Sequence, residues 1–343
     1  MSQIEQTGQV HADAAESPPD RSDFPELADP YRRELFAHCY RMLGSTHDAE
    51  DLVQETYLRA WKSYDSFEGR SSLRTWLYRI ATNVCLTALE GRAKRPLPTG
   101  LGQPSSDPEG ALVSSPEVPW LEPVPDAMAG ADATDPAALA ASRASIRLAF
   151  VAALQHLPPR QRAVLILRDV RAFRAAEVAD AVGISTVAVN STLQRARAQL
   201  ALVSPDADTV TEPSDPAQKE LLERYVQAFW DKDVTTLVKL FTEDVVWEMP
   251  PFTGWYQGAE AVSRLIDTNC PGGACDMRMV RTSANGQPAF GLYMRADDRF
   301  WPFQLQVLTV TDRVSHVAAF FDVSLFPLFG LPDSVPAPDA GTG

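Results

Sequence analysis

Cysteine is scarce in this sequence, with four residues in a chain of 343. A small disulfide-stabilised domain needs a much higher density, so we expect reduced thiols in an intracellular protein. Cys270 and Cys275 enclose only Pro-Gly-Gly-Ala, with no second cysteine pair or histidine cluster nearby. This isolation argues against zinc, and it favours two ordinary loop thiols over a redox-sensitive pair.

Long apolar runs are also missing. No stretch approaches the roughly 20 apolar residues of a membrane-spanning helix, and the N-terminus lacks the basic and then apolar segments of a signal peptide. We therefore expect a cytoplasmic protein with no membrane partner. Nor does the sequence contain a Ser-His-Asp order, a metal-ligand cluster or a phosphate-cradling glycine loop, so we expect no cofactor, no metal and no catalytic residue.

Positive charge is scarce overall but concentrated in two segments. The formal net charge is −14, and residues 96–142 carry seven acidic and no basic side chains. Residues 31–95, in contrast, hold eleven basic and eight acidic residues, and residues 143–199 hold nine arginines against three acidic residues. Because local charge decides phosphate affinity, these two segments are candidates for nucleic-acid binding.

Composition divides the chain into three folded parts separated by polar segments. Residues 1–28 are acidic and without periodicity, which predicts a disordered tail. Residues 96–142 and 203–216 are rich in proline and aspartate and are predicted as linkers, and 333–343 as a flexible tail. The folded parts are then 29–95, 143–202 and 217–332.

The first folded part is predicted to be all α-helical. A helix from Tyr31 to Leu43 ends at Gly44, and a second begins at Asp48, which is a good N-cap residue. A third helix is capped by Ser71 or Ser72. The apolar or small positions of the second helix recur at helical spacing and define a buried face: Ala49, Leu52, Val53, Thr56 and Ala60.

The outward positions of these helices resemble region 2 of the extracytoplasmic-function group of bacterial sigma factors. The resemblance rests on DAEDLVQETYLRAW from Asp48 and WLYRIATN from Trp76. It implies that Asp51, Gln54 and Glu55 bind the β′ clamp helices of core RNA polymerase. It also implies that the following residues open and hold the −10 promoter element: Arg70, Arg74, Trp76, Arg79, Asn83, Arg92, Lys94 and Arg95.

The second basic segment has the pattern of a helix-turn-helix. Pro158-Pro159 starts one helix, Gly183 supplies a tight turn, and Ser185 caps the helix that would enter a major groove. The run LPPRQRAVLILR from Leu157 is similar to sigma region 4, which implies reading of the −35 element. The outward side chains of the recognition helix are Asn190, Ser191, Gln194, Arg195 and Arg197.

The third folded part is predicted to be an α+β domain. Two helices, a strand near Val245–Met249, a helix and four strand-like runs predict a curved antiparallel sheet. The pattern from Leu222 to Trp247 resembles the SnoaL-like cone fold, whose members include enzymes and C-terminal domains of sigma factors. Its candidate small-molecule pocket comprises Trp247, Met249, Trp255, Tyr256 and Trp301, and the alternative is that these residues are ordinary core.

A Trp120-Leu121-Glu122-Pro123 motif interrupts the first linker. It is similar to a linker motif of sigma factors that carry an extra C-terminal domain, so Trp120, Leu121 and Pro123 are predicted to anchor the linker on a folded part. The whole chain is thus identified as a sigma factor whose C-terminal domain regulates it in cis.

Two other classes of protein remain as alternatives. One is a small-molecule hydrolase or isomerase fused to a DNA-binding module, for which His316, Asp322 and Asp244 are the acid–base candidates. The other is a helix-turn-helix repressor, which would bind duplex DNA without polymerase.

Overall fold

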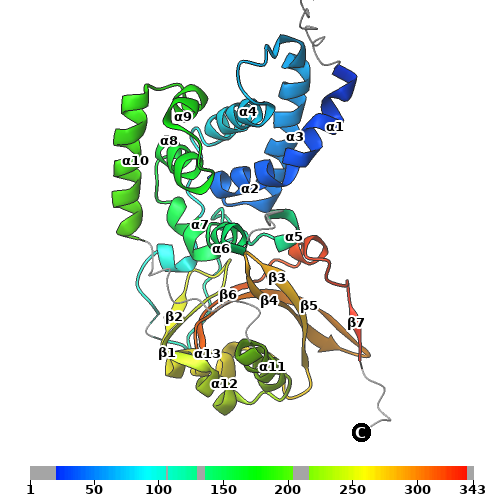
Figure 1. Ribbon diagram of the computed structural model, residues 1–343. Helices are drawn as coiled ribbons and strands as arrows, with labels where there is room; N and C mark the ends of the chain where they lie inside the picture. The colour runs from blue at the N-terminus through cyan, green and yellow to red at the C-terminus, as the bar shows by residue number, and fades with distance from the viewer. Residues whose placement is uncertain (1–20, 106, 130–135, 204–215, 338–343) are drawn as a thin grey trace, which may run out of the picture.

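The computed structural model describes residues 21–105, 107–129, 136–203 and 216–337, with the side chains of 136–139 excepted. Two helical parts lie side by side, and both rest on one face of a sheet whose other face is covered by helices (Figure 1). The predicted fold class, two helical domains followed by an α+β domain, is confirmed.

The first helical part contains α1 (Phe24–Ala28), α2 (Arg32–Leu43), α3 (Thr46–Ser63) and α4 (Leu73–Ala88), with short 3-10 turns between them. Gly44 ends α2 with φ +70°, and Ser72 caps α4, as predicted. The prediction for α3 is wrong, because Ser45 is its N-cap and accepts a bond from the Asp48 N–H. The prediction of a disordered tail is wrong for residues 21–28, which are helical because Phe24 and Ala28 are buried against the bundle. Residues 1–20 lie outside the described part of the chain.

The second helical part contains α6 (Pro136–Ala144), α7 (Leu148–Leu154), α8 (Pro159–Leu165), a π-helical turn (Ile166–Val170), α9 (Ala175–Val182) and α10 (Thr186–Ala201). The helix-turn-helix is confirmed. Gly183 adopts φ +70° between α9 and α10, a left-handed conformation that favours glycine, and the Ser185 hydroxyl accepts the Ala188 N–H at 3.2 Å.

The C-terminal part begins with α11 (Pro216–Trp230) and α12 (Val234–Leu240), whose predicted cap Asp233 accepts the Thr236 N–H. The longer strands are β1 (Phe241–Glu248), β3 (Met277–Ala284), β4 (Gln287–Ala296), β5 (Arg299–Val310) and β6 (Val314–Phe320). Shorter elements complete it: β2 (Trp255–Gln257), α13 (Ala259–Asn269), α14 (Leu325–Leu328) and β7 (Val335–Pro336).

The sheet is curved but not purely antiparallel. Its order is β2-β1-β6-β5-β4-β3, with β7 paired to β5. The expectation of an antiparallel sheet is wrong for one pair of neighbouring strands, since β1 and β6 are parallel. The chain can make this pair because α13 and four strands separate β1 from β6, a connection long enough for a crossover.

The two faces of the sheet belong to different cores. The concave face packs on α11, α12 and α13, where Tyr225, Phe229 and Val262 are buried. The outer face contributes Val307 and Ala318 to a core that is shared with both helical parts. The three parts are therefore joined by continuous apolar packing, which disfavours independent motion.

The predicted linker, residues 96–142, is ordered over much of its described length. Its residues 96–105 and 107–129 are called the strap below. Its backbone bonds to the C-terminal domain at three places: the Ser105 N–H donates to the Trp255 carbonyl, the Ser115 N–H to Pro251, and the Thr253 N–H to Val113. The linker composition therefore predicted neither this attachment nor the helices α5 and α6, which begin within residues 96–142. The described part of this segment also contains α5 (Asp126–Ala129).

Buried histidine makes the stability of this fold sensitive to acid. His38 of α2 is fully buried beside the Thr82 hydroxyl, and burial, with Arg171 and Arg41 nearby, lowers its pKa to about 3. The unfolded chain binds this proton below its usual pKa of 6.5, whereas the folded chain does not until about 3. Stability is therefore lost as the pH falls through that window.

We expect His38 to account for about 2 kcal/mol of lost unfolding free energy between pH 6.5 and pH 5. Urea unfolding of the wild type and of His38→Gln at both pH values measures this difference. The variant should show a shallower pH dependence, and equal slopes would contradict the assignment.

Candidate nucleic-acid interface

The predicted polymerase-binding residues lie on the outer surface of α3. Asp51 and Gln54 are exposed, and Glu55 is half-buried and paired with Arg59 at 2.6 Å. Sequence reasoning missed Leu58 and Trp61, which continue the same helix face and are 53% and 44% exposed. The sequence could have indicated both residues, because they are large apolar side chains that lie outside the predicted buried face of the helix.

The predicted −10 residues do not form one free surface. Trp76 is 7% exposed and packs against Phe67 in the core of the first part. Asn83 and Arg70 are exposed, whereas Arg74 is held by Glu34 of α2 at 2.9 Å. The position of Trp76 indicates that it supports the α4 surface from behind.

Helix α9 of the second part packs against α4. The Thr75 hydroxyl donates to Glu177 at 3.2 Å, and Arg79 pairs with Asp180 at the same distance. Arg171, in the loop before α9, pairs with Glu34 of α2. The face of α4 that carries Arg79 is therefore occupied by the helix-turn-helix in this structure.

Two buried arginines also join the helical parts. Arg41 of α2 donates to the Ser145 carbonyl at 3.0 Å and to its hydroxyl at 2.7 Å. Arg162 of α8 donates to the Met42 carbonyl and, at 2.7 Å, to the Gln155 amide oxygen. Burial lowers the pKa of each guanidinium to about 10, and neither has a carboxylate partner among the described residues.

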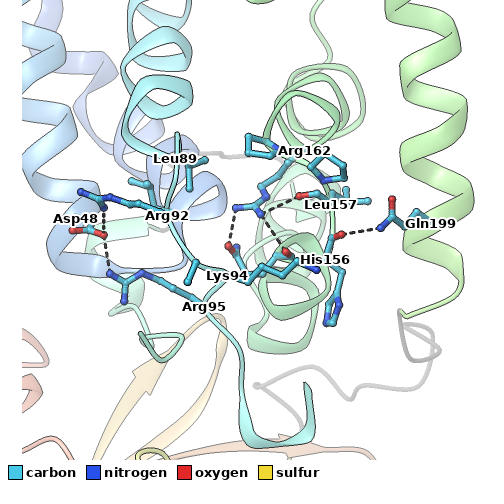
Figure 2. Close-up of a pocket in the computed structure, with 14 residues that line it drawn as sticks. Asp48, Leu89, Arg92, Lys94, Arg95, His156, Leu157, Arg162 and Gln199 are labelled. Carbon is cyan, nitrogen blue, oxygen red and sulfur yellow. Dashed lines mark hydrogen bonds and ion pairs between the residues drawn. The ribbon is translucent and has the colours of Figure 1, made fainter. Parts of the chain in front are cut away.

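The basic residues after α4 lie around a cleft. Asp48 Oδ2 accepts a bond from Arg92 at 2.9 Å and from Arg95 at 2.8 Å, and Lys94 is exposed beside them (Figure 2). The first turn of α3 thus places a carboxylate that pairs with two of the cations predicted to contact promoter phosphates.

The predicted −35 residues all lie on the outer surface of α10. Asn190, Ser191, Gln194, Arg195 and Arg197 are exposed. Arg197 is held by Asp169 in a bidentate ion pair at 2.6 and 2.8 Å. Sequence reasoning missed Val187, a large apolar side chain that is 78% exposed in the first turn of this helix.

The predicted anchor motif docks mainly on the first helical part. Leu121 is fully buried beside Gly44, and the Glu122 N–H donates to the Gly44 carbonyl at 2.9 Å. Pro123 accepts the Thr46 hydroxyl at 2.8 Å. Trp120 is half-buried and donates its indole N–H to Ser115 within the strap.

The predicted pocket residues of the C-terminal domain lie in different places. Trp247, Met249 and Tyr256 are buried in the inner core of the cone. Trp255 donates to the Gly102 carbonyl of the strap, and Trp301 is 49% exposed.

The acid–base candidates are not gathered at a common site. His316 pairs with the fully buried Glu248 at 2.8 Å, and the other oxygen of Glu248 accepts the Thr99 N–H of the strap. Asp322 accepts bonds from Ser324, and Asp244 is exposed on β1. Among the described residues there is no group of three or more potential metal ligands.

Comparisons with known proteins agree with this geometry. Residues 27–95 match sigma-70 region 2, residues 147–200 match sigma-70 region 4, and residues 222–323 match the SnoaL-like domain. The matches to regions 2 and 4, in this order, place the chain in the sigma-70 class of transcription initiation factors.

Individual similar proteins identify the group of sigma factors more closely. The ECF RNA polymerase sigma factor SigG of Mycobacterium tuberculosis (strain ATCC 25618 / H37Rv) is 63% identical over 318 residues, which cover 92% of this chain and 85% of SigG. SigJ of the same strain is 30% identical over 312 residues, covering 85% of this chain and 89% of SigJ. The crystal structure of M. tuberculosis SigJ matches with a TM-score of 0.57 at 26% identity, covering 90% of this chain and 100% of that one.

The chain belongs to the family of extracytoplasmic-function (ECF) RNA polymerase sigma factors. It is an initiation factor rather than an enzyme. No helix within the described ranges is long and apolar enough to span a bilayer.

Proposed function

We propose that the C-terminal domain holds this sigma factor in a closed arrangement that cannot engage a promoter, and that release of the domain permits initiation. The regulation acts in cis. The observation that carries the proposal is the tip of the β3–β4 hairpin, which is inserted between the two helical parts and the strap.

Asn285 occupies this tip. Its side chain is fully buried, its Oδ1 accepts the Val124 N–H at 2.9 Å, and its Nδ2 donates to the Tyr40 hydroxyl at 2.8 Å and to the Ile146 carbonyl at 2.7 Å. One amide thus ties the first helical part, the strap and the start of the second helical part to the C-terminal domain. Asn285 also has φ +56°, a left-handed conformation that asparagine tolerates well.

The neighbouring residues of the hairpin strengthen this junction. The Gly286 N–H donates to Asp126 at 2.6 Å, and Gln287 accepts the Leu148 N–H at the start of α7. A side chain at position 286 would meet Arg143 at 3.2 Å, so glycine permits this close approach. A fully bonded polar junction of this kind favours one arrangement over others, because each partner left unpaired would cost free energy.

The closed arrangement opposes promoter binding for a direct reason. The second helical part packs on the α4 surface that carries Arg79, and Asp180 of α9 pairs with Arg79 there. In the proposal, DNA replaces this carboxylate at the −10 element, and α10 reads the −35 element once the two parts have separated. Arg92, Lys94 and Arg95 then contact promoter phosphates.

Core polymerase binding is assigned to the α3 surface. We expect Asp51→Ala to weaken binding to core polymerase by about tenfold, because losing a charge at a desolvated interface costs more than losing it at an exposed helix surface. Its thermal unfolding should match the wild type. Asp244→Ala removes another exposed carboxylate, on β1, and should bind core normally. Unfolding of Asp51→Ala, or equal binding by both variants, would contradict the assignment.

A small-molecule ligand inside the cone is a second proposal. Three buried polar atoms there have no hydrogen-bond partner within the described chain: Trp247 Nε1, Gln304 Oε1 and Gln306 Nε2. Such groups cost free energy when unpaired, so a polar ligand that reaches them would bind favourably. Titrating the protein with candidate ligands while recording Trp fluorescence, with Gln306→Leu as the control, tests this proposal.

A further inference from the structure

A cleft between the two helical parts is lined by an excess of positive charge. Its volume is about 400 Å³. Arg92, Lys94 and Arg95 line it from the chain that follows α4, and Arg162 lines it from α8 (Figure 2). Asp48 is the acidic side chain among the lining residues. The cleft is therefore cationic in a chain whose net charge is −14.

A neighbouring histidine has a lowered pKa in this cleft. His156 lies at the turn between α7 and α8, and its pKa is lowered by burial and then by the charges of Lys94 and Arg162. Near neutral pH this ring consequently adds no positive charge to the cleft but can still offer a hydrogen bond.

The cleft already holds one oxyanion. A single oxygen of Asp48 accepts bonds from both Arg92 and Arg95, so two guanidinium groups converge on one point. Lys94 takes part in no ion pair within the described residues. Arg162 contributes charge rather than free donors, because its terminal nitrogens bind carbonyl and amide oxygens.

We infer that this cleft binds a small phosphorylated metabolite of the nucleoside monophosphate type. Converging arginines suit the bidentate geometry of phosphate, and a dianion would compete with Asp48 for them. The rest of the lining includes apolar side chains that suit the base and sugar: Leu43, Leu89, Leu157 and Pro158. The volume falls within the range of small-molecule sites, about 300–1,000 Å³.

The ligand acts as a corepressor. This role rests on the proposed function, in which the closed arrangement is inactive and Arg92, Lys94 and Arg95 contact promoter phosphates. The cleft has walls from both helical parts, so it is complete only when they are closed, and a ligand that binds it stabilises the closed arrangement by mass action. The ligand also occupies cations that the promoter needs.

The test is calorimetric titration of the full chain with AMP and, separately, with inorganic phosphate. We expect AMP to bind at least about tenfold more tightly than phosphate, because the apolar walls contact only the nucleoside. Lys94→Glu should weaken AMP binding by about tenfold or more. Lys239→Glu makes the same charge change at an exposed position of α12 and should leave it unchanged. Circular dichroism verifies that both variants are folded.

Three results would overturn the inference: no binding of AMP at millimolar concentration, equal affinities for AMP and phosphate, or equal weakening by both variants. This titration needs neither polymerase nor promoter, so its outcome is separate from that of the proposed function. The corepressor role is tested by promoter binding of the sigma–core complex. AMP should weaken promoter binding by the wild-type complex, and unchanged binding would overturn that role.

Discussion

Replacing Asn285 with aspartate should raise run-off transcription by the intact chain at least about tenfold when core polymerase is limiting. The substitution keeps the shape of the side chain but replaces the two N–H donors that bind the Tyr40 hydroxyl and the Ile146 carbonyl. Buried partners left unpaired cost about 1–3 kcal/mol each, so the closed arrangement should lose about 2–6 kcal/mol. Each 1.4 kcal/mol changes the closing equilibrium about tenfold.

The matched control is Gln257→Glu. It makes the same amide-to-acid change at an exposed position of β2 in the same domain, where the expected effect on transcription is within twofold or about 0.5 kcal/mol. Unchanged or reduced transcription by Asn285→Asp would show that the hairpin tip does not hold the factor inactive. A folded C-terminal domain in the variant, verified by its near-ultraviolet circular dichroism, excludes general unfolding.

The double variant Asn190→Ala/Arg195→Ala should lose −35-dependent transcription by about 100-fold. Both side chains are exposed on the outer surface of α10, where no carboxylate of the described chain holds them in an ion pair. A good base contact in the major groove contributes about 1–3 kcal/mol of discrimination, and two such contacts together give about this loss.

Promoter templates provide the control for this prediction. The wild type should distinguish the selected −35 sequence from a scrambled one, whereas the double variant should transcribe both templates at the same low level. A double variant that still discriminates would place −35 recognition elsewhere on α10, with exposed Val187 and Gln194 as the next candidates.

Much of this architecture was predictable from local sequence signals. Gly183 and Ser185 mark the turn and cap of the helix-turn-helix, and the structure contains both as predicted. The five longer strands of the C-terminal domain were located within a few residues, because alternating apolar patterns are local, whereas the short β2 and β7 were not predicted. The parallel pairing of β1 with β6 was missed, since strand order depends on contacts between residues far apart in the sequence.

The packing of the linker on the folded parts was less predictable, and so were the partners of the site residues. Pro-rich composition indicates the absence of helix and strand, but it does not reveal that Leu121 is buried beside Gly44. Likewise, Arg79 was correctly expected to lie outside the core of its own domain, and its pairing with Asp180 is a property of the closed arrangement. The surface residues of α3 and α10 follow helical periodicity and were therefore placed correctly, although their roles stay predictions.

The most direct test of the proposed closed arrangement is a distance measurement between the two helical parts in the free protein. Spin labels at Lys62→Cys on α3 and Gln194→Cys on α10, in a Cys270→Ser/Cys275→Ser background, report this distance by pulsed electron resonance. We predict one narrow distribution for the otherwise wild-type chain and a broad, longer one after Asn285→Asp. A broad distribution already present before that substitution, or a narrow one that persists after it, would contradict the account.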